Sequence, residues 1–314
     1  MYKEFFGLKE NPFSANPDPR FLVPTRETEE TFASLTYGIQ QRRGFILLTG
    51  EVGTGKTTIL NMFLEWLRGA NVATAFIFNP RLSVVEFMDF MMTDFGIPCD
   101  SELKSQKLIR INQWLLERFR GNETAVLIVD EAQNLSVEVL EEIRLLTNLE
   151  TAREKLLQIV LSGQPELEYK LNRPHLRQLR QRITLRCKTF PLTSKQTEEY
   201  ICTRLRIAGR SEGPLFSPSA IEAVHRYSQG IPRIINLLCD HALINAFADG
   251  RKYVAANTID CVAKEFELSE PATSAATSAA NGNGGQAKAS RMLDELTVLI
   301  DRLRRAEIGD GEPR

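Results

Sequence analysis

The sequence is poor in the residues from which metal sites and disulfide frameworks are built. Its 314 residues include only 3 histidines and 5 cysteines, and the cysteines, at positions 99, 187, 202, 239 and 261, never form a CxxC pair. The spacing of a zinc site is therefore absent. An odd and scattered set of cysteines is typical of a protein from a reducing compartment.

Charge of one sign and long hydrophobic runs are also missing. The 39 basic residues almost balance the 40 acidic ones. This argues against a protein that coats nucleic acid through bulk charge, although it leaves a local basic patch open. No apolar run reaches the ~18 residues of a membrane span, and the charged start at 1–4 lacks the apolar core of a signal peptide. We therefore expect a cytoplasmic protein without an integral membrane span.

What is present indicates an α/β protein with a helical addition. Residues 1–30 are rich in Pro, Asn and Asp and predict an irregular N-terminal arm. Across 31–190, apolar runs of strand length alternate with helical stretches, which predicts a parallel sheet with helices on both faces. Strand signals stop after this point, and 191–268 predict a small all-helical lid.

The individual elements follow from hydrophobic periodicity. Strands are expected at 45–49, 72–78, 125–129, 156–162 and 183–187. They are short and continuously apolar, as in a sheet with both faces buried. Helices are expected at 27–41, 57–68, 84–95, 104–119, 137–149, 165–171, 193–208, 218–227, 232–248 and 258–266.

The last part of the chain has a different composition. Residues 269–290 contain no aliphatic side chain larger than Ala, so we expect a disordered Ala/Ser/Gly linker. Residues 291–307 follow with an apolar stripe at helical spacing, which predicts a short amphipathic helix. Its expected role is contact with a partner or with a second copy, and packing on its own domain or on a membrane surface stays open.

A phosphate-binding loop is the strongest motif. Residues 50–57 match GxxxxGK[ST], the Walker A pattern, between a predicted strand and a predicted helix. Glycines let backbone N–H groups close around phosphate, Lys56 supplies a cation, and the Thr57 hydroxyl can ligate Mg²⁺. The expected nucleotide-binding residues are Gly50, Glu51, Val52, Gly53, Thr54, Gly55, Lys56, Thr57 and Thr58. The alternative is a glycine-rich turn that matches by chance.

A second motif supplies acidic groups. The apolar run at 125–129 ends in Asp130 and Glu131, a Walker B pattern, and open α/β sheets bind ligands at the carboxyl ends of their strands. We expect Asp130 to hold Mg²⁺ and Glu131 to activate the attacking water. The alternative is a solvated Asp-Glu pair that begins the next helix, where the helix dipole favours negative charge.

Further motifs carry a resemblance over most of 1–266. They are FGL at 6–8, NPF at 11–13, DP at 18–19, YGI at 37–39, DEAQ at 130–133, EIRLLTNLE at 142–150, GQPEL at 163–167, LRQRI at 179–183 and GIPR at 230–233. With the phosphate loop they make the sequence similar to AAA+ ATPases, most closely the ExeA-type general-secretion ATPases and their relatives near transposition ATPases. The resemblance implies a P-loop NTPase domain with a helical lid, and ATP and Mg²⁺ as cofactors.

The resemblance also implies roles for polar residues outside the two motifs. A first sensor would follow the next strand, at Ser162 or Gln164. Arg182, or secondarily Arg180, would reach into the nucleotide site of a neighbouring subunit. Arg233 would be the second sensor on the lid, touching the γ-phosphate from the first turn of its helix. Each arginine has the alternative of an ordinary surface position.

The resemblance sets three function hypotheses side by side. The first is an ATPase, assembled in a hexamer-like ring, that remodels a protein partner in envelope secretion or exopolysaccharide export. Longer ExeA-type proteins carry a membrane span and a cell-wall-binding region, whereas this chain resembles short relatives near exosortase systems. The second is a DNA-associated regulator that uses the basic stretch at 173–188. The third is an ATP-binding adaptor that recruits partners through its tail.

Overall fold

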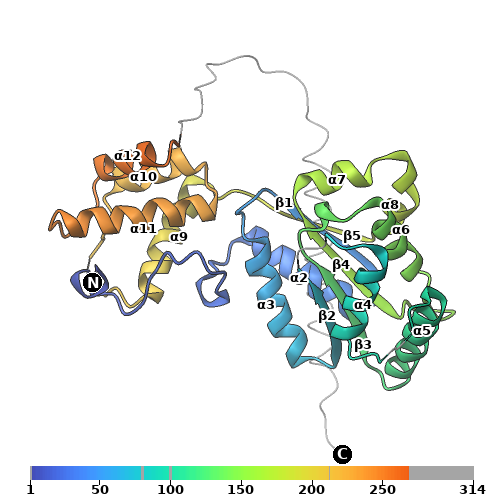
Figure 1. The fold of residues 1–314 in the computed structure, drawn as a ribbon. Coiled ribbons are helices and arrows are strands. Elements are labelled where there is room, and N and C mark those ends of the chain that lie inside the picture. The colour runs from blue at the N-terminus through green and yellow to red at the C-terminus, as the bar shows by residue number, and fades with distance from the viewer. Residues whose placement is uncertain (1, 79–80, 99–100, 212, 269–314) are drawn as a thin grey trace, which may run out of the picture. The chain divides into compact units, whose positions relative to one another are not determined.

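The computed structural model describes residues 2–78, 81–98, 101–211 and 213–268, which fall within one compact unit, Met1–Pro271 (Figure 1). The predicted linker at 269–290 and the predicted helix at 291–307 lie outside the described residues. Among the described residues, no helix has the length and hydrophobicity to cross a membrane.

A parallel sheet forms the first part of the fold, as the sequence predicts. Its strands are β1 (Phe45–Gly50), β2 (Val72–Ile77), β3 (Thr124–Val129), β4 (Leu157–Gly163) and β5 (Leu185–Thr189). The five-stranded sheet has the order β2-β3-β4-β1-β5, and every neighbouring pair is parallel. Strands β1, β3 and β4 are buried almost throughout, whereas β2 and β5 are only partly buried because they are the edges.

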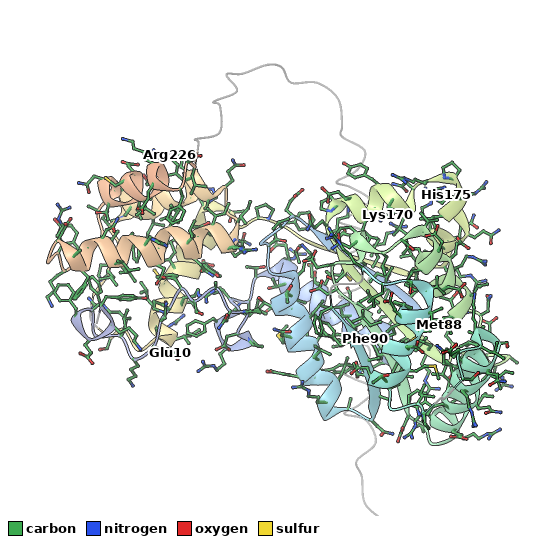
Figure 2. All side chains as sticks on the ribbon, in the orientation of Figure 1. Glu10, Met88, Phe90, Lys170, His175 and Arg226 are labelled. Carbon is green, nitrogen blue, oxygen red and sulfur yellow. The ribbon has the colours of Figure 1, made fainter. Side chains whose placement is uncertain are left out.

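Helices cover both faces of the sheet, again as predicted. One face packs against α4 (Val84–Asp94), α5 (Lys104–Arg120), α6 (Val137–Leu146), α7 (Pro165–Leu171) and α8 (Arg177–Arg182), together with the short turns η2 (Ala132–Asn134) and η3 (Pro174–Leu176). The other face packs against α2 (Arg26–Gln40) and α3 (Lys56–Gly69). On α4, Met88 is buried in the core between the sheet and the helices α4 to α8, and Phe90 is exposed (Figure 2).

The last strand begins two residues later than expected, at Leu185 instead of position 183. Helix α8 was not predicted from the sequence, and Ile183 caps its C-terminal end instead of starting the strand. This helix has six residues, of which only Leu179 is buried, so it leaves no periodic signal. Arg180 and Arg182 therefore lie on a helix and not on an extended segment.

Side-chain caps explain several helix starts. The side chains of Thr25, Ser83 and Thr193 each accept a hydrogen bond from the backbone N–H three residues on. The side chain at that third position in turn accepts a hydrogen bond from the backbone N–H of the cap residue. Such capping boxes satisfy N–H groups that a helix leaves without a partner in its first turn. The helices α2, α4 and α9 (Ser194–Ile207) therefore begin where the sequence specifies.

The helical region after the sheet has a core of its own. It contains α9, α10 (Pro218–Ser228), α11 (Pro232–Ala248) and α12 (Ala256–Glu265), and the last three pack together (Figure 1). The N-terminal arm belongs to the same core through the buried residues Phe6, Leu8, Phe13, Phe21 and Val23. The arm is also less irregular than expected, because it contains α1 (Tyr2–Phe5) and the turn η1 (Pro19–Phe21).

A buried arginine ties the arm to α9. Arg204 is only 6% exposed. Its Nε donates to the backbone carbonyl of Pro12 over 2.6 Å, and its Nη1 donates to the Tyr200 hydroxyl. The guanidinium also lies over two aromatic rings, 4.8 Å from the centroid of Phe21 and 5.2 Å from that of Tyr200. These contacts hold the arm at the wall of the cavity described next.

Candidate active site

The loop between β1 and α3 depends on glycines. Gly53 and Gly55 have φ values of 79° and 96°, which L side chains rarely adopt. At Gly50 an added Cβ would lie 2.8 Å from the carbonyl oxygen of Thr189 and still closer to its side chain. At Gly53 it would lie 2.7 Å from the Cβ of Arg233. The loop can therefore take this path only with glycine at these positions.

Lys56 begins α3 and lies buried under the loop. Its Nζ donates to the backbone carbonyls of Gly50 at 2.8 Å and Glu51 at 2.9 Å. Burial lowers the pKa of Lys56 below its ordinary value, while the charges of Glu131 and Asp130 act in the opposite direction. The Lys56 ammonium group is thus held by loop carbonyls and lies close enough to Glu131 and Asp130 for their charges to act on it.

Asp130 lies at the carboxyl end of β3, where it meets the phosphate loop. Its Oδ2 accepts from the Thr57 hydroxyl at 3.1 Å, and its Oδ1 accepts from the Ser162 hydroxyl at 2.8 Å. Asp130 is 5% exposed and Ser162 is fully buried. A hydroxyl and a carboxylate at this spacing suit Mg²⁺, which takes one or two protein oxygens and completes its shell with water and phosphate oxygens.

Glu131 is the next residue and has an unusual backbone. Its φ of 52° and ψ of 35° lie in the left-handed region, which costs energy for a residue other than glycine. Its Oε2 accepts from the side-chain amides of Gln133 and, at 3.3 Å, of Gln164. The half-buried Glu131 also lines the cavity beside the loop.

The two first-sensor candidates occupy different places. Ser162, near the end of β4, contacts Asp130, whereas Gln164, the residue before α7, contacts Glu131 and lines the cavity. The structure therefore places Ser162 on the side of the proposed metal ligand and Gln164 on the side of the proposed base.

A cavity of about 1010 Å³ contains the site. Its wall combines the loop from Val52 to Thr58 with the arm, the segment after β5, and helices α9 and α11. Arg233 lines it from the first turn of α11, with an exposed side chain, and its backbone N–H donates to the Gly53 carbonyl at 3.2 Å. The predicted lid sensor thus contacts the backbone of the phosphate loop.

The two α8 arginines are not brought into this cavity. Arg180 donates through Nη1 to Asn172 Oδ1 at 2.9 Å. Arg182 lies close enough to Glu150 to help lower the pKa of that carboxyl, after the hydrogen bond and the charge of Lys155. Neither arginine is among the residues that line the cavity of its own chain.

Sequence reasoning missed two polar residues of the site. Thr189, at the end of β5, hydrogen-bonds the loop residue Thr54 at 2.7 Å between hydroxyls. A signal for it existed, because the carboxyl ends of parallel strands meet at one edge of the sheet. Gln133 belongs to the DEAQ motif, but the motif predicts no role for it, since its contacts to Glu131 and Gln164 depend on a turn that the sequence does not specify.

Comparisons with known proteins agree with this fold and site. Residues 39–171 match the family described as AAA domain. Over 266 residues, 84% of the chain, the sequence is 45% identical to general secretion pathway protein A of Aeromonas hydrophila. The chain spans 48% of that protein's length. The resemblance to ExeA-type general-secretion ATPases that the motifs predict is thereby confirmed.

Solved structures support the fold alone. The Cdc6p protein of Pyrobaculum aerophilum aligns with a TM-score of 0.62 at 19% identity, covering 81% of this chain and 70% of its own. The ORC2 protein of Aeropyrum pernix aligns with a TM-score of 0.60 at 16% identity, covering 82% and 72%. These likenesses confirm the predicted fold of a parallel sheet followed by helices.

Proposed function

We propose that this protein binds ATP with Mg²⁺ and hydrolyses it. The observation that carries the proposal is the meeting of Lys56, Thr57, Asp130 and Glu131 at the carboxyl ends of β1 and β3, with Glu131 in the wall of a cavity. A cation, a hydroxyl and two carboxylates at a glycine-rich loop are the groups that phosphoryl transfer to water requires.

Each residue has a distinct part in the proposed chemistry. The N–H groups of the loop and Lys56 hold the phosphates, and Thr57 and Asp130 hold the metal ion. A bound Mg²⁺ would supply positive charge that offsets the negative charge of the transition state. Glu131 orients a water and takes its proton. Gln164, which follows β4, and Arg233, on α11, sense whether the γ-phosphate is present.

The proposed setting is an envelope secretion or exopolysaccharide export system. Its support is the 45% identity to a general secretion pathway protein. Hydrolysis would drive assembly or remodelling of a protein partner there. The chain covers about half of that relative, so the relative's full activity is not carried over. A cytoplasmic location stays a prediction of the sequence.

The proposed working form is a ring of identical subunits, hexamer-like as in related ATPases. Arg182, or secondarily Arg180, would complete the site of the neighbouring subunit. The position of α8 outside the cavity of its own chain supports a role in trans. An arginine supplied by a neighbour offsets negative charge in the transition state, where it accelerates hydrolysis most.

A DNA-associated regulatory ATPase is the second candidate. The observation in its favour is the exposure of Arg173, Arg177 and Arg186 around α8 and β5. Such a surface would bind phosphate backbones with an affinity that falls steeply as salt rises. The adaptor hypothesis is less well supported, because Lys56, Asp130 and Glu131 are all present and mutually close.

The experiment that tests hydrolysis is steady-state ATP turnover by the wild type, Lys56→Ala and Glu131→Gln. We expect the wild type to release phosphate in the presence of Mg²⁺ and both variants to lose that activity. Exposed Gln113→Ala on α5 is the control and should match the wild type. Wild-type protein that binds ATP but never releases phosphate, alone or with DNA, would favour the adaptor.

A further inference from the structure

Two amide groups hold one oxygen of the Glu131 carboxylate. The Nε2 atoms of Gln133 and Gln164 both donate to Oε2, the latter over 3.3 Å. Among the described residues, no hydrogen bond is made to the other oxygen, Oε1. One side of the carboxylate is therefore fixed by protein and the other is left for a ligand in the cavity that Glu131 lines.

Gln133 is itself fixed at its other end. Its Oε1 accepts from the backbone N–H of Gln164 at 3.0 Å. Its backbone carbonyl accepts from Lys170 Nζ at 2.6 Å, and the same amine donates to the Leu135 carbonyl at 2.8 Å. Lys170 lies on α7, where Figure 2 labels it. These bonds fix the η2 turn and the side-chain amide together, so Gln133 has little freedom to leave Glu131.

The end of β4 leaves space for this amide. At Gly163 an added Cβ would lie 2.8 Å from Gln133 Oε1 and 2.9 Å from Leu167 Cδ2. Both distances are too short for ordinary contact, so a larger residue would displace Gln133 or α7. The Glu131 carboxylate is thus held in place by a group of four residues, Gln133, Gly163, Gln164 and Lys170.

We propose that Gln133 is a positioning residue for ATP hydrolysis. It fixes Oε2 of Glu131 so that Oε1 takes the proton of the attacking water, and this inference rests on the proposed function. In that step the water oxygen forms a bond to the γ-phosphorus, and the bond to the β–γ bridging oxygen breaks with its electron pair leaving on ADP. The water proton passes to Glu131 Oε1 and then to solvent.

The left-handed backbone of Glu131 explains why its carboxylate needs a residue that fixes its position. A residue at φ 52° is strained and tends to relax unless its surroundings fix it. Relaxation would swing the carboxylate away from the water. A misplacement of about 1 Å at a reacting group can reduce a rate about 100-fold without weakening substrate binding.

Two substitutions separate positioning from a structural role. Gln133→Met keeps the length of the side chain but removes both of its hydrogen bonds. Gln133→Glu keeps an acceptor for the Gln164 N–H and removes the donor to Glu131. We expect both variants to lower kcat about 30- to 100-fold, because the donor is lost in each. The KM for ATP and the affinity for a non-hydrolysable ATP analogue should stay within about twofold of wild type, since neither parameter uses the Glu131 carboxylate.

A control variant and a measurement of folding distinguish a loss of positioning from other causes of a lower kcat. Gln113→Met makes the same chemical change at an exposed position of α5 and should leave kcat unchanged. Thermal unfolding confirms that each variant is folded, and Gln133→Glu serves if Gln133→Met is not. A kcat of Gln133→Glu equal to wild type overturns the proposal, because a turn held only through the acceptor would survive. A loss of analogue affinity equal to the loss of kcat also overturns it. A wild type without turnover instead removes the proposed function, independently of Gln133.

Discussion

At the scale of single residues, the site depends on a buried positive charge. Lys56 is 6% exposed, and its Nζ is bonded only to loop carbonyls among the described residues. Neutral carbonyls are weaker partners for an ammonium group than phosphate oxygens are. The phosphate oxygens of a nucleotide would therefore be stronger partners for Lys56 than the loop carbonyls are.

The burial of Lys56 predicts a pH dependence of ATP binding. Burial lowers the pKa of Lys56 from its ordinary 10.5, so the side chain loses its charge at a lower pH than a free lysine does. Because the charged form binds phosphate, the affinity for ATP should fall as the pH rises toward that lowered pKa. Titration calorimetry across alkaline pH measures the effect, with Lys56→Met as the control whose weak binding should not change over this range. An affinity of the wild type that stays flat to pH 10.5 would contradict the prediction.

At the same scale, Gly163→Ala should separate binding from turnover. The added methyl group would meet Gln133 Oε1 at 2.8 Å and push the amide away from Glu131. We expect turnover to fall at least about tenfold while ATP affinity changes little. The matched control is Gly69→Ala on α3, where nothing lies within 4 Å of the new atom. Equal turnover by both glycine variants would show that the space at Gly163 has no role in catalysis.

At the scale of elements, the sequence predicts the sheet and most helices because their hydrophobic periods are long. Helices Pro165–Leu171 and Pro232–Ala248 have the predicted bounds, and the other predicted helices differ by one to three residues at one end or both. Helix Arg177–Arg182 was missed because six residues with one buried side chain show no period. The arm was also mispredicted in part, since its packing on the helical core involves residues about 200 positions apart, such as Pro12 and Arg204.

The contact between the arm and α9 leads to a stability prediction. Arg204→Lys keeps the charge but loses the planar guanidinium that lies over the rings of Phe21 and Tyr200 and donates to the Pro12 carbonyl. We expect it to lower the free energy of unfolding by about 1–3 kcal/mol. Arg206→Lys on the same helix is the control, because Arg206 is exposed and, within the described part of the chain, its side chain bonds only Thr203. Urea denaturation compares the two, and equal stability would mean that Arg204 does not tie the arm down.

At the same scale, the strand ends explain how much of the site could be predicted. The loop at 50–57 and Asp130-Glu131 follow strands directly, so motif and topology together place them side by side. The contacts of Gln133 and Thr189 come from a short turn and from an edge strand. The turn that holds Gln133 carries no spacing that sequence reasoning can use, whereas Thr189 could have been found from its place at the carboxyl end of a parallel strand. The arginines of α8 lie outside the cavity, so their predicted role needs a second subunit.

At the scale of the whole molecule, the proposed assembly predicts complementation between inactive variants. Lys56→Ala and Arg182→Ala should each lack turnover, but a mixture should regain part of it. In mixed assemblies, an Arg182→Ala site retains Lys56 and receives the arginine of a Lys56→Ala neighbour. Turnover per subunit of the wild type should also rise with protein concentration. Mixtures that stay as inactive as their components would indicate that Arg182 does not act in trans.

The central claim is that this cavity hydrolyses ATP through Glu131, and the identity of the retained nucleotide tests it most directly. Wild type and Glu131→Gln are incubated with ATP and Mg²⁺, separated from free nucleotide, and the bound nucleotide is identified by chromatography. We predict ADP on the wild type and intact ATP on Glu131→Gln, because the variant keeps the phosphate loop and the metal ligands but loses the base. ADP on both proteins would contradict the assignment of Glu131, and intact ATP on both would contradict hydrolysis itself.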